Sequence, residues 1–234
     1  MFTRVVVKAS GQAFAGTSGS GIDATAVARI ADEVIEAAEV AQIAVVVGGG
    51  NVLRGSSSDA WQIERVDADN VGMLGTAINA LLLRAAITSR CERDVRVMSA
   101  LPMPSVAEPY VRLRAVRHLE KGRIVVMACG IGQPFVTTDY PGVQRAIELG
   151  ADALLAAKNG VDGVYAADPM VEPDAVRFER LTFDEVIKRE LNVMDMSAFL
   201  LARDHGLPIS VFDIGAGGAM ARVLRGEQVG TLIS

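Results

Sequence analysis

Short apolar runs rich in β-branched residues alternate along the chain with stretches whose apolar residues recur at helical spacing. Six runs are apolar almost throughout, which is typical of strands in a sheet that helices cover on both faces. They are residues 4–8, 43–47, 95–98, 124–128, 153–156 and 209–212. The alternation predicts a single α/β domain over residues 1–234, built as a three-layer αβα sandwich with a mostly parallel central sheet.

The segments between these runs carry helix signals. Val27, Ile30 and Val34 recur at helical spacing behind Asp23, which is a candidate N-cap. Further helices are predicted over 73–84, 143–149 and 198–203, and a short one starts at the capping-box pattern Thr182-Phe183-Asp184-Glu185. Ligands of such sheets bind beyond the carboxyl ends of the strands, so the loops that follow strands are where chemistry is expected.

Composition narrows the function further. The formal net charge of −5 argues against an overall basic surface that would bind nucleic acid. The basic stretch 112–123 is predicted to be the solvated face of a helix. No uninterrupted apolar run approaches the ~20 residues of a membrane helix, and the opening residues lack a signal-peptide core, so we expect a cytoplasmic protein without a membrane partner. Cys91 and Cys129 lack metal-type spacing, and His118 and His205 are single residues, so we expect structural roles for them and no metal site.

The segment after the fourth strand is Gly130-Ile131-Gly132-Gln133-Pro134-Phe135-Val136-Thr137-Thr138-Asp139. Glycines let backbone amides approach an anion, and the two threonines add hydroxyl donors. The helix predicted just behind the segment would favour negative charge at its start. This loop is therefore predicted to bind a phosphate group.

Two other strands end in similar loops. Lys8-Ala9-Ser10-Gly11 would bring a positive charge and further donors to phosphate, although a lysine that simply ends a strand fits equally well. Gly48-Gly49-Gly50 follows the second strand with Arg54 close behind, and three glycines in a row favour close backbone approach to a ligand over a plain turn. Neither a dinucleotide fingerprint nor a Walker A loop fits, because Leu53 takes the third-glycine position and no Gly-Lys-Ser/Thr occurs.

Two carboxylates have two possible roles each. Asp69 stands before a predicted helix and could bind ribose hydroxyls, but the sequence favours a helix N-cap. Asp195 also precedes a predicted helix, either as an N-cap or as a carboxylate that orients a lysine.

The segment 159–169 is rich in turn residues. Asn159, Tyr165 and Asp168 could flank a purine ring, and Asp162-Gly163 could form the turn of a β-hairpin. The two interpretations are compatible.

Taken together, these segments resemble the bacterial UMP kinases of the amino-acid kinase superfamily almost from end to end. The run 161–169 marks the superfamily, whereas the run 98–104 and the loop 130–139 are specific to UMP kinases. The resemblance implies an amino-acid kinase-like fold and transfer of the γ-phosphoryl group of ATP to UMP, with Mg²⁺ as cofactor.

The same resemblance implies roles for individual residues. Lys8, Asp195 and Arg54 would be catalytic, with Asp195 orienting Lys8. The residues that would bind ATP are Lys8, Ala9, Ser10, Gly11, Gly50, Arg54, Asn159, Tyr165 and Asp168. The residues that would bind UMP are Gly49, Asp69, Ile131, Gly132, Gln133, Pro134, Phe135, Val136, Thr137 and Thr138.

Members of this family are typically homohexamers that GTP activates and UTP inhibits. The resemblance implies a GTP effector site between subunits, formed by residues 16–21 and the region of Arg84 and Arg96. The chain leaves the family pattern at Gln12 and at Gln133, Val136 and the run Tyr140-Pro141-Gly142. Pro141 is tolerable only in a first helical turn.

Two other functions are found on the same fold. One is phosphorylation of an amino acid or carbamate, against which the Thr137-Thr138-Asp139 sequence argues. The other is storage of molybdate or tungstate clusters without catalysis, which requires ligands for a metal oxide, whereas this chain has only two histidines.

Overall fold

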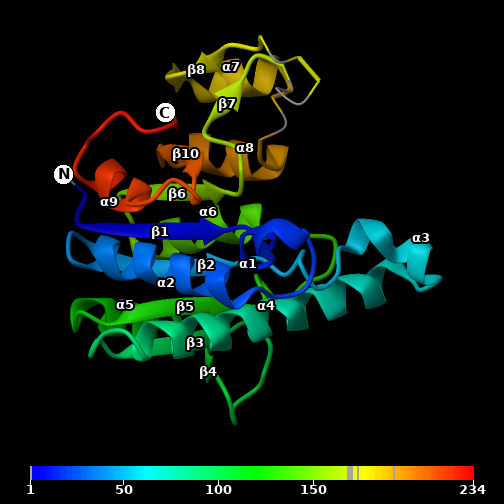
Figure 1. Ribbon diagram of the computed structural model, residues 1–234, viewed down its shortest axis with the longest axis vertical. Helices are drawn as coiled ribbons and strands as arrows, with labels where there is room; N and C mark the ends of the chain where they lie inside the picture. Colours follow the sequence, from blue (N-terminus) through cyan, green and yellow to red (C-terminus); the bar gives the residue numbers. More distant parts are fainter. Residues whose placement is uncertain (1, 168–170, 173, 192) are drawn as a thin grey trace.

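The computed structural model describes residues 2–167, 171–172, 174–191 and 193–234, which form one large sheet between two layers of helices (Figure 1). Nine strands of this described part lie in the order β4-β3-β5-β2-β1-β6-β10-β11-β9. The six central strands are β1 (Arg4–Ala9), β2 (Gln42–Val47), β3 (Val95–Ser99), β5 (Ile124–Ala128), β6 (Ala153–Lys158) and β10 (Ile209–Asp213). The edge strands are β4 (Glu108–Pro109), β11 (Thr231–Ile233) and β9 (Arg180–Leu181).

The six predicted strands are confirmed, and each matches its predicted range to within two residues. All neighbouring strands of the sheet pair in parallel except β10 and β11, which are antiparallel. Side chains of β1 alternate between the two faces, and both faces are buried, which explains why the run is apolar throughout. The predicted mostly parallel sheet is therefore confirmed.

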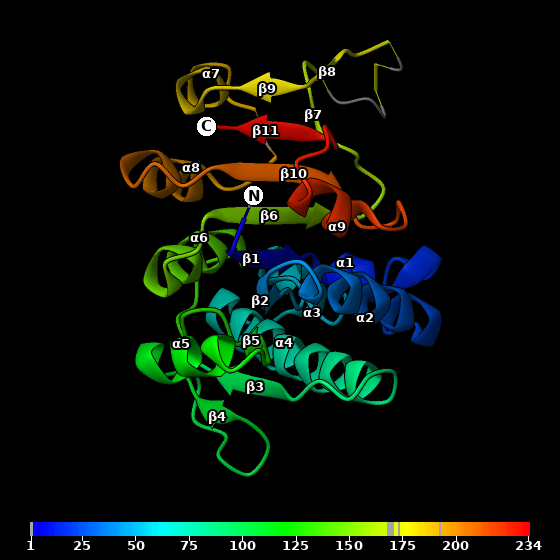
Figure 2. The same ribbon diagram turned by 90° about the vertical axis from the view of Figure 1, so that its left-hand side faces the viewer.

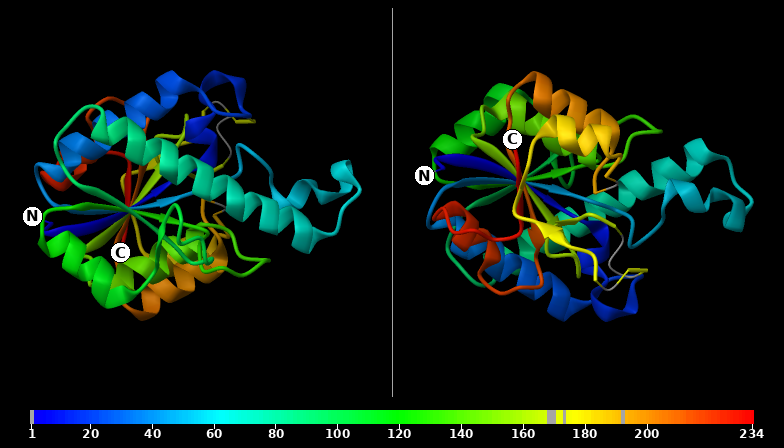
Figure 3. Two further views of the ribbon diagram at one scale, coloured as in Figure 1. Left: turned by 90° about the horizontal axis from the view of Figure 1, so that it is seen from below. Right: turned by 90° about the horizontal axis from the view of Figure 1, so that it is seen from above.

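Helices cover both faces of the sheet, as Figures 2 and 3 show. The face bearing Val5 and Val7 packs against one layer, which comprises α1 (Gly11–Phe14), α2 (Ala24–Ala38), α4 (Arg65–Thr88) and α9 (Ala219–Leu224). The face bearing Val6 packs against the other layer, which comprises α5 (Arg112–Glu120), α6 (Asp139–Leu149), α7 (Phe183–Lys188) and α8 (Met196–Asp204). The predicted three-layer αβα sandwich is confirmed.

Local helix signals also proved informative. Asp23 caps α2 by accepting a hydrogen bond from the Ala26 amide at 2.7 Å, and Thr182 and Glu185 form the predicted capping box of α7. Pro141 is the third residue of α6 and so lies in its first turn, where proline is tolerated. The basic stretch 112–123 begins as α5, whose three arginines are all exposed.

The hairpin after β6 differs from the prediction. β7 (Val164–Tyr165) pairs antiparallel with β8 (Arg177–Phe178), but Asp162-Gly163 comes before β7 and is not the turn between the strands. A Cβ at Gly163 would lie 2.7 Å from side-chain atoms of Arg177 and Thr231, so glycine is needed here for close packing and not for a turn.

Helix α4 extends well beyond its predicted start. Together with η2 (Gly55–Ser57) and α3 (Ser58–Trp61), its first turns project from the body of the molecule (Figure 3). Among the described helices, α4 alone has the length and apolar composition to cross a membrane, a property shared by helices in the cores of globular proteins. Here its inner face packs on β3 and β5 and includes fully buried Asn79, so α4 is part of the domain core.

Candidate active site

An open cleft of about 410 Å³ lies at the carboxyl ends of β1, β2 and β5. The parallel register brings these ends together, because Lys8 of β1 pairs with Val46 of β2, and Val46 pairs with Met127 of β5. The loops that follow the strands, together with the start of α4 and Asp195, line the cleft. Its size falls within the range of small-molecule sites.

Most of the predicted site residues meet in this cleft. Those that line it are Lys8, Ser10, Gly11, Gly49, Gly50, Arg54, Asp69, Ile131, Gln133, Val136, Thr137, Thr138 and Asp195. The two loops assigned to ATP and the loop assigned to UMP thus share one space, although they are separated by up to 130 residues in the chain.

Other predicted residues lie outside the cleft lining. Ala9 is fully buried in the sheet, and Gly132, Pro134 and Phe135 belong to the loop without lining the cleft. Asn159 follows β6, and the Tyr165 hydroxyl donates to Asp162 at 2.5 Å near the β7–β8 pair. Asp168 lies outside the described residues.

The glycines after β1 and β2 are required by contacts between protein segments. A Cβ at Gly11 would lie 2.5 Å from the Gly50 amide nitrogen, and one at Gly49 would overlap the carbonyl oxygen of Gly72 in α4. The sequence suggested that these glycines serve close approach to a ligand. The structure shows that they first allow two loops and a helix to pack together, and both glycines belong to the cleft lining.

A buried pair of asparagines holds this packing in place. Asn51 and Asn79 are almost inaccessible to solvent and exchange hydrogen bonds of 2.7 and 3.2 Å. Asn79 also donates to the Gly48 carbonyl at 2.8 Å, and Asn51 donates to the Gly21 carbonyl at 2.8 Å. Buried amides are stable only when satisfied, so this network fixes the glycine loop relative to α4 and the 16–21 segment.

Lys8 is buried and forms an ion pair with Asp139, whose Oδ1 lies 2.7 Å from the Lys8 Nζ. Asp139 is the first residue of α6, so its carboxylate lies at a helix N-terminus. Burial by itself would raise the pKa of Asp139, but the nearby charges of Lys8 and Lys158 outweigh it and hold the pKa below its usual value. Asp139 is therefore a charged partner of Lys8 at neutral pH.

The expected role of Asp195 in orienting Lys8 stays a prediction, and the structure shows the contacts through which it would act. The ion partner of Lys8 among the described residues is Asp139, whereas Asp195 accepts a hydrogen bond from the Thr137 hydroxyl at 2.6 Å. The Asp195 amide donates to the other oxygen of Asp139 at 3.3 Å. Asp195 is thus linked to Lys8 through Asp139, which contacts both residues. It begins α8 without a side-chain cap, so its N-cap interpretation is also incomplete.

Lys158 was missed by the sequence reasoning, as was Asp139 as a partner of Lys8. Lys158 ends β6 on the same face as Lys8, and its Nζ donates to the Val193 carbonyl. Burial and the positive charge of Lys8 lower the pKa of Lys158 to about 8, opposed by Asp139 and Asp195. A lysine at the end of an apolar strand was the available signal, but the adjacency of β6 and β1 was not visible in the sequence.

The 130–139 loop is anchored to α4 at two points. The Cys129 amide donates to the Thr76 hydroxyl at 2.6 Å, and the Phe135 amide donates to the Asp69 carboxylate at 2.9 Å. Asp69 is the fifth residue of α4, so the N-cap interpretation is wrong; the helix begins at Arg65, which pairs with Asp69 one turn later. Asp69 instead presents its carboxylate to the cleft and the loop.

Arg54 lies over the other glycine loop, since a Cβ at Gly50 would be 3.3 Å from its Nε. It forms no ion pair with any described residue, so its charge is available to a phosphate. The described residues include no group of three potential metal-binding side chains.

Comparison with known proteins agrees with this arrangement. Residues 3–213 match the amino acid kinase family. The chain is 59% identical to the uridylate kinase of Frankia alni over 99% of this chain and 91% of the relative, and 49% identical to that of Xanthomonas oryzae over 99% and 96%. The solved UMP kinase of Bacillus anthracis matches with a TM-score of 0.96 and 47% sequence identity, and the match covers 100% of this chain and 96% of the other. The solved UMP kinase of Ureaplasma parvum matches with a TM-score of 0.93 and 31% sequence identity, and that match covers 100% of this chain and 99% of the other. The chain therefore belongs to the amino acid kinase family and, within it, to the uridylate kinases.

Proposed function

We propose that this protein is a UMP kinase that reversibly transfers the γ-phosphoryl group of MgATP to UMP, giving ADP and UDP for pyrimidine nucleotide biosynthesis. The observation that carries the proposal is the shared cleft, in which Lys8 and the Gly48–Gly50 loop face the 130–139 loop. One side offers donors for the ATP phosphates and the other offers donors for the acceptor. The relatives named uridylate kinase support the choice of UMP.

Phosphoryl transfer mainly needs two polyanions brought into line and their charge offset. Lys8, Arg54 and the glycine-loop amides would stabilise negative charge on the transferring group. Mg²⁺, bound with ATP, would supply further charge neutralisation. The UMP phosphate is a nucleophile at neutral pH, so no general base is needed, and Asp139 would serve to hold Lys8 in place.

On the acceptor side, Asp69 would accept hydrogen bonds from the ribose hydroxyls of UMP. It lines the cleft and already holds the loop through the Phe135 amide. Thr137 and Thr138 lie in the same lining and would donate to UMP. On the donor side, Asn159 and Tyr165 would contact the adenosine, where β6 ends beside β1.

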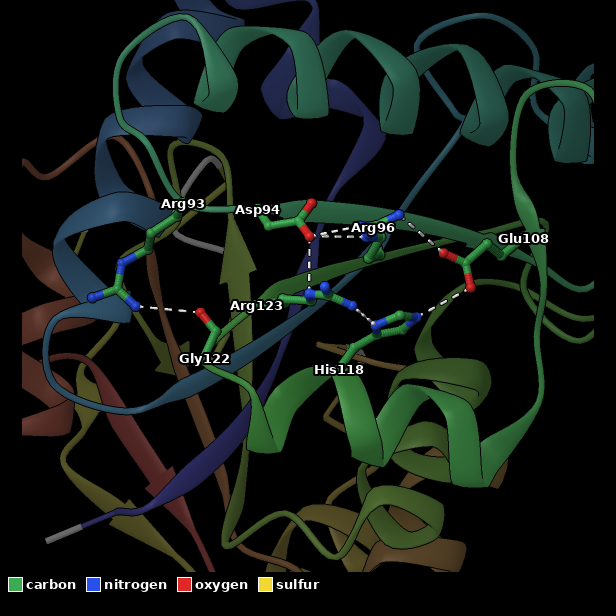
Figure 4. A network of polar contacts seen from close by, with 7 residues as sticks. All are labelled: Arg93, Asp94, Arg96, Glu108, His118, Gly122 and Arg123. Carbon is green, nitrogen blue, oxygen red and sulfur yellow. Dashed lines mark hydrogen bonds and ion pairs between the residues drawn. The ribbon is translucent and has the colours of Figure 1, made fainter.

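Regulation by GTP as activator and UTP as inhibitor is part of the proposal. Figure 4 shows Arg96 in a network with Asp94 at 2.6 Å, while Arg123 joins Asp94 to His118 and His118 faces Glu108. Arg96 lies near the amino end of β3, whereas the 16–21 segment follows the carboxyl end of β1. Within a single chain these two regions thus lie toward opposite ends of the sheet. A site that uses both would have to bring together regions of different subunits, which supports an effector site shared between subunits.

We further propose that the protein is a cytoplasmic homohexamer. Val71, Leu74, Ile78 and Leu82 form a stripe at helical spacing on α4, and each is 39–51% exposed. An exposed apolar stripe of this kind favours burial against another subunit. A second copy of the chain is the expected partner.

The test is ADP release in a coupled assay with UMP, CMP and dCMP, each with and without GTP or UTP. We expect strong preference for UMP, and a Lys8→Ala variant should lose on the order of 10²–10³ in kcat, by analogy with removal of other charge-stabilising donors. Phosphorylation of glutamate, aspartate or carbamate without UMP would instead support another kinase of the family. Stoichiometric molybdenum or tungsten in a preparation without kinase activity would support storage.

A further inference from the structure

Four charged side chains gather at one wall of the cleft, and two of them are lysines on adjacent strands. Val6 and Lys8 of β1, and Ala156 and Lys158 of β6, face the same helical layer, because side chains alternate along strands that pair in register. Asp139 and Asp195 come from that layer, at the starts of α6 and α8. With both lysines charged, the cluster is electrically balanced.

Lys158 differs from Lys8 in what it touches. Its Nζ donates to the Val193 carbonyl, two residues before Asp195, and it is absent from the cleft lining. Asp213, its register partner on β10, is occupied by the amides of Gly160 and Gly215 at 2.9 Å each. The charged groups that influence Lys158 are therefore Lys8, Asp139 and Asp195.

We propose that Lys158 is a positioning residue for phosphoryl transfer: it ties the 193–195 segment to the end of β6 and supplies the second positive charge that balances Asp139 and Asp195 beside Lys8. The inference rests on the proposed kinase function.

The charge of Lys158 matters because the substrates are polyanions. Without it, Lys8 would face two carboxylates, and the cluster would carry one net negative charge next to the phosphates. A neutral Lys158 amine can still donate to Val193, so loss of the proton removes the charge while the segment stays anchored. Since the pKa of Lys158 is about 8, this loss falls within an accessible pH range.

The experiment measures kcat and KM for ATP and UMP from pH 6.5 to 10 in wild type, Lys158→Met and Lys158→Arg. Wild type should lose activity as pH rises through about 8. Lys158→Met should be roughly tenfold slower in kcat already at pH 7, the effect expected when one stabilising charge is removed from beside the reacting phosphates. Because this variant has no group to titrate at position 158, it should also lack the alkaline decline. Lys158→Arg, charged throughout the range, should recover much of the rate and also lack the decline.

Lys121→Met, at the exposed lysine that directly follows α5, is the matched control and should reproduce the wild-type profile. The inference is overturned if Lys158→Met keeps the wild-type kcat, or if it is slower but retains the alkaline decline, which would indicate loosened packing only. Absence of UMP phosphorylation by wild type would instead refute the proposed function, so the two failures are distinguishable.

Discussion

The buried ion pair between Lys8 and Asp139 permits a quantitative prediction for Asp139→Asn. At 2.7 Å and an effective dielectric constant of about 20, the attraction is about 6 kcal/mol. Much of it offsets the cost of removing both charges from water, but deleting one partner leaves the other charge buried and unpaired. We therefore expect Asp139→Asn to lose about 3–5 kcal/mol of unfolding free energy.

Urea unfolding at fixed protein concentration measures this loss, because the stability of an oligomer depends on concentration. The same loss should lower Tm by roughly 6–20 °C for a chain of this size. Asp204→Asn is the control: Asp204 is in a surface pair with Arg203 at 3.2 Å, its side chain is 63% exposed, and its replacement should cost no more than about 1 kcal/mol. Equal losses in the two variants would refute the electrostatic argument.

The contribution of Asp139 to the free energy of unfolding should change with pH in a defined direction. The pKa of Asp139 is lowered in the folded protein, so its contribution to stability is complete above the unfolded value of about 3.9. That contribution is lost as the pH falls through the folded pKa. Asp139→Asn should therefore lose less stability than wild type on acidification, and parallel losses would contradict this assignment.

Three further predictions concern other parts of the site and surface. Asp69→Asn should raise KM for UMP roughly tenfold while KM for ATP changes little, because one charge-assisted hydrogen bond is weakened; steady-state kinetics with each substrate varied would expose an unchanged UMP response. Asn79→Ala would leave the Gly48 carbonyl and the Asn51 side-chain oxygen without their hydrogen-bond donor, and should destabilise the fold by about 1–3 kcal/mol for each of these two groups. A urea midpoint equal to that of wild type would exclude a stabilising network. Leu74→Glu should yield smaller assemblies by light scattering, whereas Leu113→Glu, at a 70% exposed leucine on α5, should not; unchanged mass in both variants would remove the α4 stripe from the interface.

Much of the fold could be predicted because its signals are local. Apolar runs marked all six central strands, and the caps at Asp23 and Thr182 each depend on atoms within three residues. The hairpin turn was misplaced because Asp-Gly is a turn signal by itself, whereas Gly163 is needed for packing against Thr231, 68 residues away. The N-cap interpretation of Asp69 was wrong because the projecting start of α4 carries little apolar periodicity, so the sequence placed the start of the helix too late.

The sequence by itself determined which loops carry the chemistry, because residue type decides what a side chain can bind: glycine amides, hydroxyls, Lys8 and Arg54 suit phosphate. Only the tertiary structure decided which charges meet. Strand order places β6 beside β1, and the start of α6 brings Asp139 to Lys8, so Asp139 is the ion-pair partner of Lys8 among the described residues. Electrostatic interactions depend on distance and burial, and both arise from contacts between segments that lie far apart in the chain.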